Sequence, residues 1–511
     1  MRSSLFLILF VFFGFYSCIP QQRLPNQERP SDNINDRKQP ALTQASLCTG
    51  QTSSSNRDVI VHMFNVPFAQ IQKELPFLAQ AGYGQIQISP PQLSNGGPWW
   101  GRYQPLDYRV IDGPLGDEQA LRSLIQEAQK CGIRIIADVV LNHMANLGPD
   151  FDLNYPPQWV RQKYQVTGLF GPQDFKPAFC IRNWDNPTEV VNGRLCGGDG
   201  DSGLPDLDLS RSWVIETHRA YLKKLIDLGI KGFRVDAVKH MEVSYFAKVF
   251  TPDLLQGTFV FGEVIANQWT FDRDLKPYLE GTSMGLMDFP LQQTLKDAFG
   301  LGGSLRALVD PVRFKGALSW DRAITFIVNH DIPNNDGFRY LILDPKDEQM
   351  AYTYILGRDA GVPHIYSDLG IADGRQEDRW KQAHRAPTLV KKIGFHNAMH
   401  GTSQKVVYVN DCVLVFQRGE KGLVSINKCE NTFAQDVQTT LTQGAYHDVL
   451  SSQTIDVQAP TVRIQIPGRS SVMYLHDTKR QIQSSVHQRL EQAKKQLQSA
   501  PPNQRRSLRE H

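Results

Sequence analysis

The sequence predicts an α/β protein with a helix-covered parallel sheet, an insertion into that sheet and an antiparallel β domain after it. From about residue 58, short runs rich in Val, Ile and Phe alternate with segments of helical period. This alternation is interrupted once, between residues 143 and 232, and it ends near residue 396. Strands that alternate with helices along the chain are typical of a parallel sheet, and fully apolar strands indicate that both faces of the sheet are covered. The 511 residues are enough for about two or three domains.

Six apolar runs are the predicted strands of the parallel sheet. Each is short and is bounded by turn-forming residues, as buried strands are. The helical segments bury one apolar face, and the last two end at a Gly just past the periodic residues, which is a helix stop. The strands lie within DVIVHMF (58–64), YGQIQIS (83–89), IRIIADVVL (133–141), IKGFRVDAV (230–238), FVFGEVI (259–265) and AITFIVN (323–329), and the helices lie within 68–82, 117–132 and 211–229.

Two regions depart from the alternating pattern and are predicted to be separate units. Residues 144–205 are rich in Pro, Gly and Asn, and a structureless loop of that length is improbable, so we expect a small inserted domain. Residues 396–476 carry short β runs between turns, which is typical of an antiparallel β domain. The helix-covered sheet then comprises residues 58–143 and 206–395.

The two ends of the chain are predicted to lie outside these domains. Residues 1–18 have a basic residue and then an apolar run too short to span a bilayer, the layout of a secretory signal peptide. Ser17 and Cys18 resemble a lipoprotein cleavage box, so the leader allows lipidation at Cys18, ordinary cleavage nearby or an uncleaved anchor. We expect a secreted or envelope-anchored protein. Residues 19–57 are a polar linker, and residues 477–511 a basic tail, partly helical or disordered.

Cysteine usage also favours export. Seven cysteines become six once Cys18 is set aside, and six can pair in fifteen ways. Cys412 and Cys429 flank two predicted strands around a Gly-containing turn, so they could face each other across a hairpin. Cys131 could instead be a buried thiol. The expected pairs are Cys412–Cys429, Cys180–Cys196 around a polar loop and, by elimination, Cys48–Cys131.

Four predicted strands end in charged or polar side chains. Within GFRVDAVKH (232–240), Arg234 and Asp236 share one face of the strand, while Phe233 and Val235 share the other. In a parallel barrel, catalytic groups project from the C-terminal ends of strands, and buried carboxylates are costly unless they are paired. These strand ends therefore indicate an active site. In chain order they carry Asp138, Asn142 and His143; Arg234, Asp236, Lys239 and His240; Glu263; and Asn329, His330 and Asp331.

The segments DVVLNH, GFRVDAVKH, FGEV and VNHD resemble, in order, the four signature regions of the α-amylase family of glycoside hydrolases. A fifth stretch, GYGQIQISPPQ followed by WWGRYQPLDY, is similar to the subgroup of animal α-amylases and their bacterial relatives. The resemblance covers about residues 58–476. It implies a (β/α)8 TIM barrel, a small inserted domain after the third strand and a C-terminal antiparallel β-sandwich domain.

The resemblance implies retaining endo-hydrolysis of α-1,4-glucosidic bonds in starch, glycogen and related glucans. Such cleavage needs a nucleophile and an acid/base about 5–5.5 Å apart. By resemblance, Asp236 is the nucleophile, Glu263 the acid/base and Asp331 a third acid that binds sugar hydroxyls. Arg234 would keep Asp236 ionised, whereas burial would keep Glu263 protonated. The implied sugar contacts are a stacking wall of Trp99, Trp100, Tyr103 and Gln104, and polar contacts from His143, Arg234, Lys239, His240 and His330.

Two other functions stay open at this point. A transglycosidase of the same family, a glucanotransferase, would pass the covalent intermediate to a sugar acceptor. A non-catalytic glucan-binding protein would be expected to lack one carboxylate, and Asp236, Glu263 and Asp331 are all present. The net charge of +3 does not mark a nucleic-acid binder. We expect a monomer with no nucleic-acid partner, and membrane contact only through a lipidated Cys18.

The resemblance also implies a calcium ion that clamps the inserted domain to the barrel. Calcium prefers several oxygen ligands, including carboxylate, amide and backbone carbonyl oxygens. Asn142 and Asp206 match the side-chain ligands of the family. Arg194 and His240 match the positions that donate backbone carbonyls.

Animal-type members of the family additionally bind chloride through two arginines and an asparagine near the acid/base. Arg234 and Asn329 match two of these positions, but His364 stands at the third. Without the second cation, we expect activity that does not depend on chloride.

Overall fold

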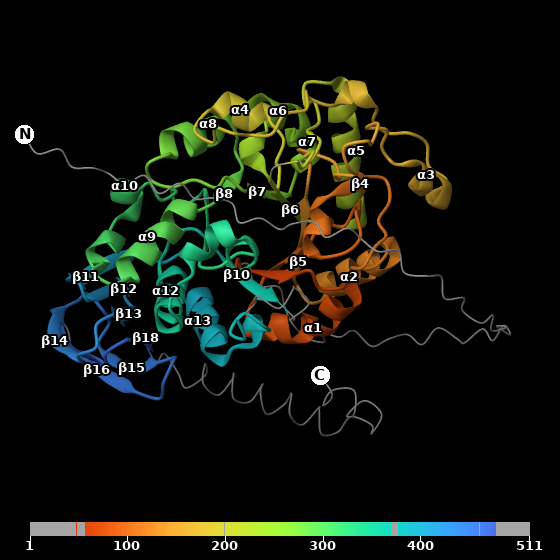
Figure 1. The fold of residues 1–511 in the computed structure, drawn as a ribbon. Coiled ribbons are helices and arrows are strands. Elements are labelled where there is room, and N and C mark those ends of the chain that lie inside the picture. Colours follow the sequence, from red (N-terminus) through yellow and green to blue (C-terminus); the bar gives the residue numbers. More distant parts are fainter. Residues whose placement is uncertain (1–47, 49–56, 199, 369–376, 459, 477–511) are drawn as a thin grey trace, which may run out of the picture.

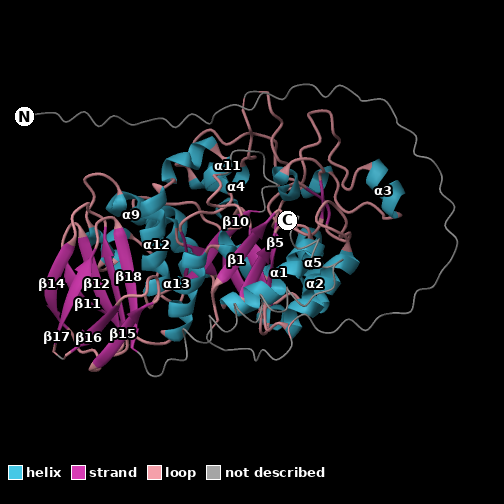
Figure 2. Ribbon diagram, turned by 90° about the horizontal axis from the view of Figure 1, so that it is seen from below, coloured by secondary structure: helices cyan, strands magenta, loops and turns pink. Residues whose placement is uncertain are grey.

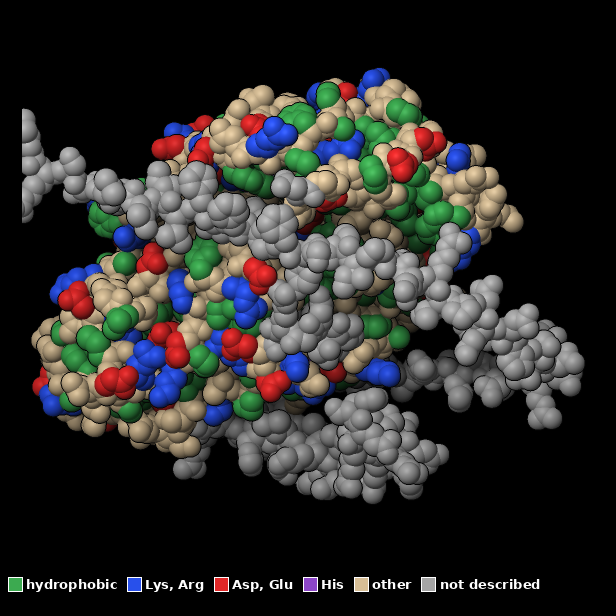
Figure 3. All heavy atoms as spheres, viewed as in Figure 1, with side chains coloured by type: hydrophobic (Ala, Val, Ile, Leu, Met, Phe, Trp, Pro, Cys, Tyr) green, Lys and Arg blue, Asp and Glu red, His purple; other side chains and the backbone are tan. Residues whose placement is uncertain are grey.

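The structure is a computed structural model that describes residues 48, 57–198, 200–368, 377–458 and 460–476 (Figure 1). The predicted signal peptide, Cys18, most of the linker and the basic tail lie outside the described residues. In the described part, no helix is long and apolar enough to cross a membrane. On the face drawn in Figure 3, acidic and basic side chains are interspersed.

Eight parallel strands close into a barrel, which confirms the predicted fold class. Each strand pairs with its neighbours in chain order, and the last strand pairs with the first. Figure 2 shows the strands at the centre of this part of the molecule, with helices around them. The strands are β1 (Ile60–Phe64), β2 (Gln85–Ile88), β5 (Arg134–Val139), β6 (Gly232–Val235), β7 (Phe259–Gly262), β8 (Gly285–Met287), β9 (Ala323–Phe326) and β10 (Val362–Asp368).

Helices in the connections between strands cover the outside of the barrel. Two of them end at glycines in the left-handed region, Gly82 with a φ of 94° and Gly229 with a φ of 109°, where a residue with a Cβ is strained. The helices predicted from the sequence are α1 (Phe68–Ala81), α2 (Glu118–Lys130) and α5 (Ser212–Leu228); the others around the barrel are α6 (Val243–Val249), α7 (Pro252–Leu255), α8 (Lys276–Gly281), α9 (Phe289–Phe299), α10 (Pro311–Lys315), α11 (Asp331–Asn334), α12 (Pro345–Gly357) and α13 (Pro387–Ala398).

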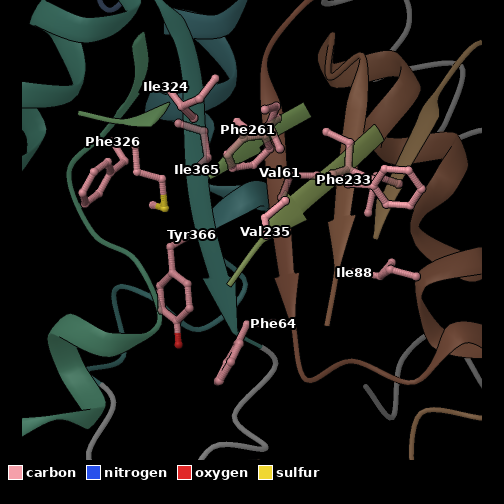
Figure 4. Packing of buried hydrophobic residues seen from close by; sticks show 14 of the residues in the cluster. Val61, Phe64, Ile88, Phe233, Val235, Phe261, Ile324, Phe326, Ile365 and Tyr366 are labelled. Atoms are coloured by element: carbon pink, nitrogen blue, oxygen red, sulfur yellow. The ribbon is translucent and has the colours of Figure 1, made fainter. Parts of the chain in front are cut away.

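Alternation along the strands separates the apolar core from the polar site. Figure 4 shows buried apolar side chains packed along several barrel strands, and Val61, Ile88, Phe233 and Ile365 among them are fully buried. Because successive strand side chains point to opposite faces, the residues between these apolar ones point the other way. The polar side chains of the candidate site come from those intervening positions.

Two connections at the C-terminal end of the barrel are longer than the rest. The one after β2 forms a hairpin of β3 (Leu93–Ser94) and β4 (Pro105–Asp107), and a 3-10 turn at Trp99–Tyr103 lies between them. The one after β5 contains α3 (Gln158–Tyr164) and α4 (Pro187–Asn192) and returns to the barrel through α5. This second segment is the one predicted as an inserted domain, and 144–205 remain its proposed bounds.

The C-terminal region is antiparallel, as predicted. Six strands form one sheet in the order β11-β12-β13-β18-β15-β16, and β14 pairs with β17 in a second. Apolar side chains of both sheets, including Val415, Leu423, Val462 and Ile464, share one buried cluster. The strands are β11 (Gln404–Val409), β12 (Val413–Arg418), β13 (Gly422–Asn427), β14 (Phe433–Gln438), β15 (Gly444–Asp448), β16 (Thr454–Val457), β17 (Thr461–Ile466) and β18 (Ser470–His476).

Three disulfides join the expected cysteine pairs. The Cα–Cα distances are 5.1 Å for Cys48–Cys131, 5.7 Å for Cys180–Cys196 and 5.3 Å for Cys412–Cys429. The alternative that Cys131 is a buried thiol is therefore wrong. The hairpin prediction also holds, since β12 and β13, which Cys412 and Cys429 flank, pair in antiparallel register.

Candidate active site

Arg234 on β6 lies at the centre of the predicted site. Its Nη1 donates to Asp138 Oδ1 at 2.9 Å and to Asp236 Oδ1 at 2.7 Å, and its Nη2 lies 2.6 Å from Glu263 Oε2. The arginine is 1% exposed. One buried cation thus joins three carboxyl groups that come from three consecutive barrel strands, β5, β6 and β7.

Asp236 and Glu263 occupy equivalent positions at the ends of neighbouring strands. Val235 is paired with Gly262, so Asp236 and Glu263 are the next residues along the two strands. The Glu263 N–H donates to the Val235 carbonyl at 3.0 Å, which continues the ladder past the end of the strand. Neighbouring strands lie about 4.8 Å apart. Both carboxyl groups reach the same guanidinium and can therefore act on one bond.

Burial controls the protonation of the acids around Arg234. It raises the pKa of Glu263 to about 8; Arg234 opposes this shift, and Asp331 and Asp236 add to it. Burial also raises the pKa of Asp138 and of Asp331 to about 7, again against the effect of Arg234. A single guanidinium does not balance four carboxylates in a buried site. The cluster therefore holds protons near neutral pH.

An aromatic wall (Phe64, Trp99, Tyr103 and His330) stands beside these acids. The His330 ring stacks on Tyr103 and on Phe64, each at 5.0 Å between centroids, and Trp99 meets it edge-on at 5.8 Å. The Tyr103 hydroxyl donates to Asp138 at 3.0 Å. His330 Nε2 lies 3.6 Å from Asp331 Oδ2. The wall thus connects the loop after β2 to the acid after β9.

Trp100 and Gln104, the other predicted members of the stacking wall, do not belong to this ring cluster. Trp100 is 45% exposed. The Gln104 side-chain oxygen accepts from Asn95 Nδ2 at 3.3 Å and from the Asn146 N–H at 3.2 Å. Gln104 therefore ties the hairpin after β2 to the segment after β5.

The remaining predicted sugar contacts already have partners in the protein. His143 Nε2 lies 3.0 Å from the Tyr103 carbonyl, and His240 Nδ1 lies 3.0 Å from the Val190 carbonyl. Burial lowers the pKa of His143, and it lowers the pKa of His240 to about 4, so both rings are neutral. Lys239 Nζ pairs with Asp274 at 2.9 Å. A sugar hydroxyl at Lys239 would have to share the ammonium with Asp274.

The predicted calcium ligands Asn142 and Asp206 meet where the segment after β5 rejoins the barrel. Asn142 Nδ2 donates to Asp206 Oδ1 at 3.0 Å, and both residues are buried. Asn142 Oδ1 and Asp206 Oδ2 have no hydrogen-bond partner. Buried oxygens without partners are unusual, and these two fit a hard cation.

A cation at this position would also need backbone oxygens. Among the described residues, no group of three or more His, Cys, Asp and Glu side chains is placed to hold a metal ion. The carbonyls of Arg194 and His240 remain the predicted further ligands. The Arg194 carbonyl accepts one hydrogen bond, from Ile181 at 3.2 Å.

The predicted chloride positions hold one arginine, one asparagine and a histidine that is neutral. Asn329 Nδ2 is buried without a partner, but His364 Nε2 is hydrogen-bonded to Gln87 Oε1 at 2.8 Å. Burial lowers the pKa of His364 to about 3, so the ring is neutral. Of the three residues at these positions, Arg234 is then the one cation, and its guanidinium already contacts three carboxyl groups.

Sequence reasoning missed part of the site. It named Asp138 without a role and did not name His62 or Gln87. Gln87 Nε2 donates to Asp138 at 3.3 Å, and the His62 ring lies edge-on to His330 at 5.5 Å between centroids. The sequence did carry a signal for His62 and Gln87. Each is a polar residue between two apolar ones within a predicted strand, in VHM (61–63) and IQI (86–88).

A closed parallel barrel whose strand ends bring two neighbouring carboxyl groups together, one of them kept protonated by burial, is the arrangement of a glycoside hydrolase. The family model for the α-amylase catalytic domain matches residues 68–299. An α-amylase of Aeromonas hydrophila is 44% identical over 440 residues, which are 81% of this chain and 95% of that protein. The chain belongs to the α-amylase family. An α-amylase-related protein of Drosophila varians is 30% identical and covers 78% of the chain and 87% of its own length.

Solved structures agree with this assignment. A mutant of α-amylase I from Eisenia fetida, in complex with maltohexaose, has a TM-score of 0.69 and 25% identity, and covers 83% of this chain and 98% of its own. An α-amylase from Geobacillus thermoleovorans in complex with acarbose has a TM-score of 0.64 at 18% identity, and covers 83% and 99%. At that identity the second likeness shows the fold alone.

Proposed function

We propose that the protein cleaves α-1,4-glucosidic bonds inside glucans such as starch and glycogen, with retention of configuration. One observation carries this proposal. Asp236 and Glu263 occupy equivalent positions at the ends of adjacent strands, and each carboxyl group contacts the guanidinium of Arg234. Retention requires two carboxyl groups about 5–5.5 Å apart, a spacing that neighbouring strands supply. The maltohexaose bound to the Eisenia fetida relative supports the substrate class.

Asp236 is assigned as the nucleophile and Glu263 as the acid/base. The Asp236 carboxylate attacks the anomeric carbon, the glycosidic C–O bond breaks, and the Glu263 proton goes to the leaving oxygen. Glu263 then takes a proton from water, whose oxygen attacks the same carbon and releases Asp236. Arg234, 2.7 Å from Asp236, stabilises the carboxylate that attacks and later leaves. Asp331 is assigned to sugar hydroxyls.

The aromatic wall is proposed to hold the sugar beside the nucleophile. Flat rings such as Trp99 and Tyr103 bury the apolar C–H faces of a sugar, and the neutral His143, His240 and His330 can exchange hydrogen bonds with its hydroxyls. Trp100, Gln104 and Lys239 are proposed as outer contacts. Lys239 would reach a sugar while keeping Asp274 as its counter-ion.

Calcium is proposed at Asn142 and Asp206, with the carbonyls of Arg194 and His240. The support is the pair of unpartnered oxygens. When bound, the ion would supply positive charge that compensates the buried Asp206 and would join the segment after β5 to the barrel.

Export is proposed from the predicted signal peptide together with the three disulfides, which persist in oxidising compartments.

Activity independent of chloride is proposed because His364 supplies no second cation. Dialysis against chloride-free buffer should leave the rate of starch cleavage unchanged. A rate that rises severalfold on adding sodium chloride, and not on adding sodium nitrate at equal ionic strength, would contradict this.

The experiment that tests the function is incubation of the purified protein with soluble starch, following reducing ends and product sizes. New reducing ends with a rapid fall in chain length are expected for endo-hydrolysis. Redistribution of chain lengths without new reducing ends would make the protein a glucanotransferase. Binding without any change in the glucan would make it a non-catalytic binding protein.

A further inference from the structure

The rim of the barrel beyond Glu263 carries the exposed side chain of Trp269. This residue lies in the loop between β7 and α8, shortly after Glu263, and is 85% exposed. Exposing an indole to this extent gives up the hydrophobic gain of burying it. An indole on the rim of a sugar-binding site presents a flat apolar face on which a sugar ring can stack.

Local hydrogen bonds fix the loop that presents Trp269. The Asn267 side-chain oxygen accepts from the N–H groups of Trp269 at 2.9 Å and Thr270 at 3.2 Å. The Thr270 hydroxyl in turn accepts from the Asn267 N–H at 3.1 Å. Gly316 packs against the loop, because a Cβ added there would lie 3.3 Å from the Cα of Gln268. The backbone that carries the indole therefore needs little further ordering when a ligand arrives.

An ion pair joins this loop region to the segment after β5. Arg273 pairs with Asp185 at 2.7 Å and with Asp274 at 2.7 Å. Asp185 comes just before Asn186, the N-cap of α4, and α4 lies close to α8 in Figure 1. Its neighbour Trp184 meets the His240 ring edge-on at 5.9 Å. The two tryptophans are thus carried by segments that one ion pair holds together.

The position of Trp269 around the barrel indicates which part of a glucan it can meet. The aromatic wall with Trp99 and Tyr103 follows β2, and Trp269 follows β7, with β5 and β6 between them. The two features therefore lie on different sides of the barrel mouth, with Arg234 and Asp236 on a strand between. Glu263 is the residue proposed to protonate the leaving oxygen, and the loop that follows it is therefore the part of the rim next in the chain to the leaving group.

We propose that Trp269 is a binding platform for the leaving-group segment of an α-1,4-glucan, with its indole face against a glucose ring. This inference rests on the proposed function. The same platform holds an acceptor sugar after the first step. The acceptor hydroxyl then attacks the anomeric carbon, its proton goes to Glu263, and the bond to Asp236 breaks. Trp269 therefore also raises the ratio of transfer to hydrolysis.

The test compares Trp269→Ala and Trp269→Phe with Trp320→Ala. Trp320 is a matched control because it is 72% exposed but lies near the opposite end of the barrel, where its carbonyl accepts from Gly361, just before β10. One substrate is maltoheptaose. The other is p-nitrophenyl α-maltotrioside, cleaved at the nitrophenyl bond so that its leaving group contains no sugar.

For Trp269→Ala, we expect kcat/KM on maltoheptaose to fall about three- to tenfold, mainly through KM, because one ring-stacking contact is lost. Release of nitrophenol should be unchanged, and transfer products at high maltoheptaose concentration should decrease. Trp269→Phe should keep most of the wild-type behaviour, and Trp320→Ala all of it.

Equal maltoheptaose kinetics and transfer products in wild type and Trp269→Ala would overturn the platform while leaving the hydrolase assignment intact. An equal loss on both substrates would also overturn it, since a general structural effect would then explain the result. If the wild type cleaves neither substrate, the proposed function fails and the platform fails with it.

Discussion

At the scale of single residues, Arg234 sets the electrostatics of the site. Its side chain is 1% exposed and faces Asp138, Asp236 and Glu263 at distances of 2.6 to 2.9 Å. A buried charge is tolerated when it is paired and hydrogen-bonded, and here the pairing is shared among several acids. The shared cation leaves each acid only partly compensated. This is why a carboxyl group can keep its proton beside an arginine.

Glu263 should set the alkaline limit of activity. Burial raises its pKa to about 8, so the carboxyl group is protonated below that pH and loses its proton as the pH rises through it. Because the reaction needs the protonated form, kcat/KM should fall above about pH 8. The measurement is kcat/KM on maltoheptaose from pH 5 to 10. An alkaline limb near 4.5, the usual value for glutamic acid, would contradict the assignment.

Replacing the proposed nucleophile should abolish turnover and preserve the fold. Asp236→Asn keeps the shape of the side chain but removes the attacking carboxylate, so kcat should fall by at least about 10⁴-fold. The melting temperature should change by only a few degrees. Asp227→Asn, on the exposed surface of α5, is the matched control and should keep full activity. Normal turnover in Asp236→Asn would remove the nucleophile from the mechanism.

The proposed catalytic acids could be predicted from the sequence because each comes after an apolar strand, Asp236 and Glu263 directly and Asp331 a few residues past the end of β9. Asp236, Glu263 and Asp331 lie past the C-terminal ends of their strands, and those ends meet in a parallel barrel whatever the details of packing. Gln87 and His364 could not be predicted in the same way. Their hydrogen bond joins residues 277 positions apart, on β2 and β10, which lie on either side of β1 in the closed barrel.

At the scale of elements, several contacts hold the segment after β5 against the barrel. Lys176, with a side chain 7% exposed, pairs with Glu242 at 3.1 Å and donates to the Val191 carbonyl at 2.7 Å. His240 contacts the Val190 carbonyl. The pair of Asn142 and Asp206 lies at the same junction but keeps two oxygens unpaired. A cation at those oxygens would add a contact that the protein itself does not supply.

Calcium should therefore stabilise this junction. Chelation with EDTA should lower the melting temperature, and added calcium should restore it, since an ion that binds only the folded state stabilises it in proportion to the logarithm of its concentration. Asp206→Asn should abolish the rise in melting temperature on adding calcium, because an amide supplies no negative charge. Asp208→Asn, two positions away, should keep it. Identical melting in EDTA and in calcium would exclude the proposed metal site.

Two barrel strands were not among those predicted, and each lacks the signal used for the others. β8 has only three residues, Gly285–Met287, which are too few to show a pattern. β10 contains Pro363, which argues against a central strand, and polar residues that serve specific partners. Ser367, for example, is hydrogen-bonded to His384 Nδ1 at 2.7 Å. Such strands form because the closing barrel supplies their neighbours.

At the scale of the whole molecule, cations from the C-terminal domain cover the ends of barrel helices. Arg418 on β12 is 2% exposed and donates to the carbonyls of Gly357 and Arg358, at the end of α12. Its Nη2 donates to the carbonyls of Met399 and Thr402, just after α13. Lys428 does the same for α9, through the carbonyls of Ala298, Gly300 and Gly303.

These contacts explain why the two domains are joined along helices of the barrel. The last carbonyls of a helix have no partner within it and carry partial negative charge, so a buried cation satisfies them well. In Figure 1, the C-terminal strands lie beside α9, α12 and α13, whose ends receive these cations. The sequence predicted both domains but not this junction, because basic residues in β strands are usually solvent-exposed.

Removing Arg418 should therefore destabilise the molecule far more than removing an exposed arginine of the same domain. In Arg418→Met the carbonyls at the ends of α12 and α13 stay buried without a donor, so the free energy of unfolding should fall by about 3–5 kcal/mol. Arg463→Met on β17, whose partner Asp436 is also exposed, should cost less than about 1 kcal/mol. Thermal unfolding followed by circular dichroism and by loss of glucan hydrolysis should show one coincident transition, shifted to lower temperature in Arg418→Met. If only the C-terminal domain melted early while hydrolysis persisted, the junction would not support the barrel.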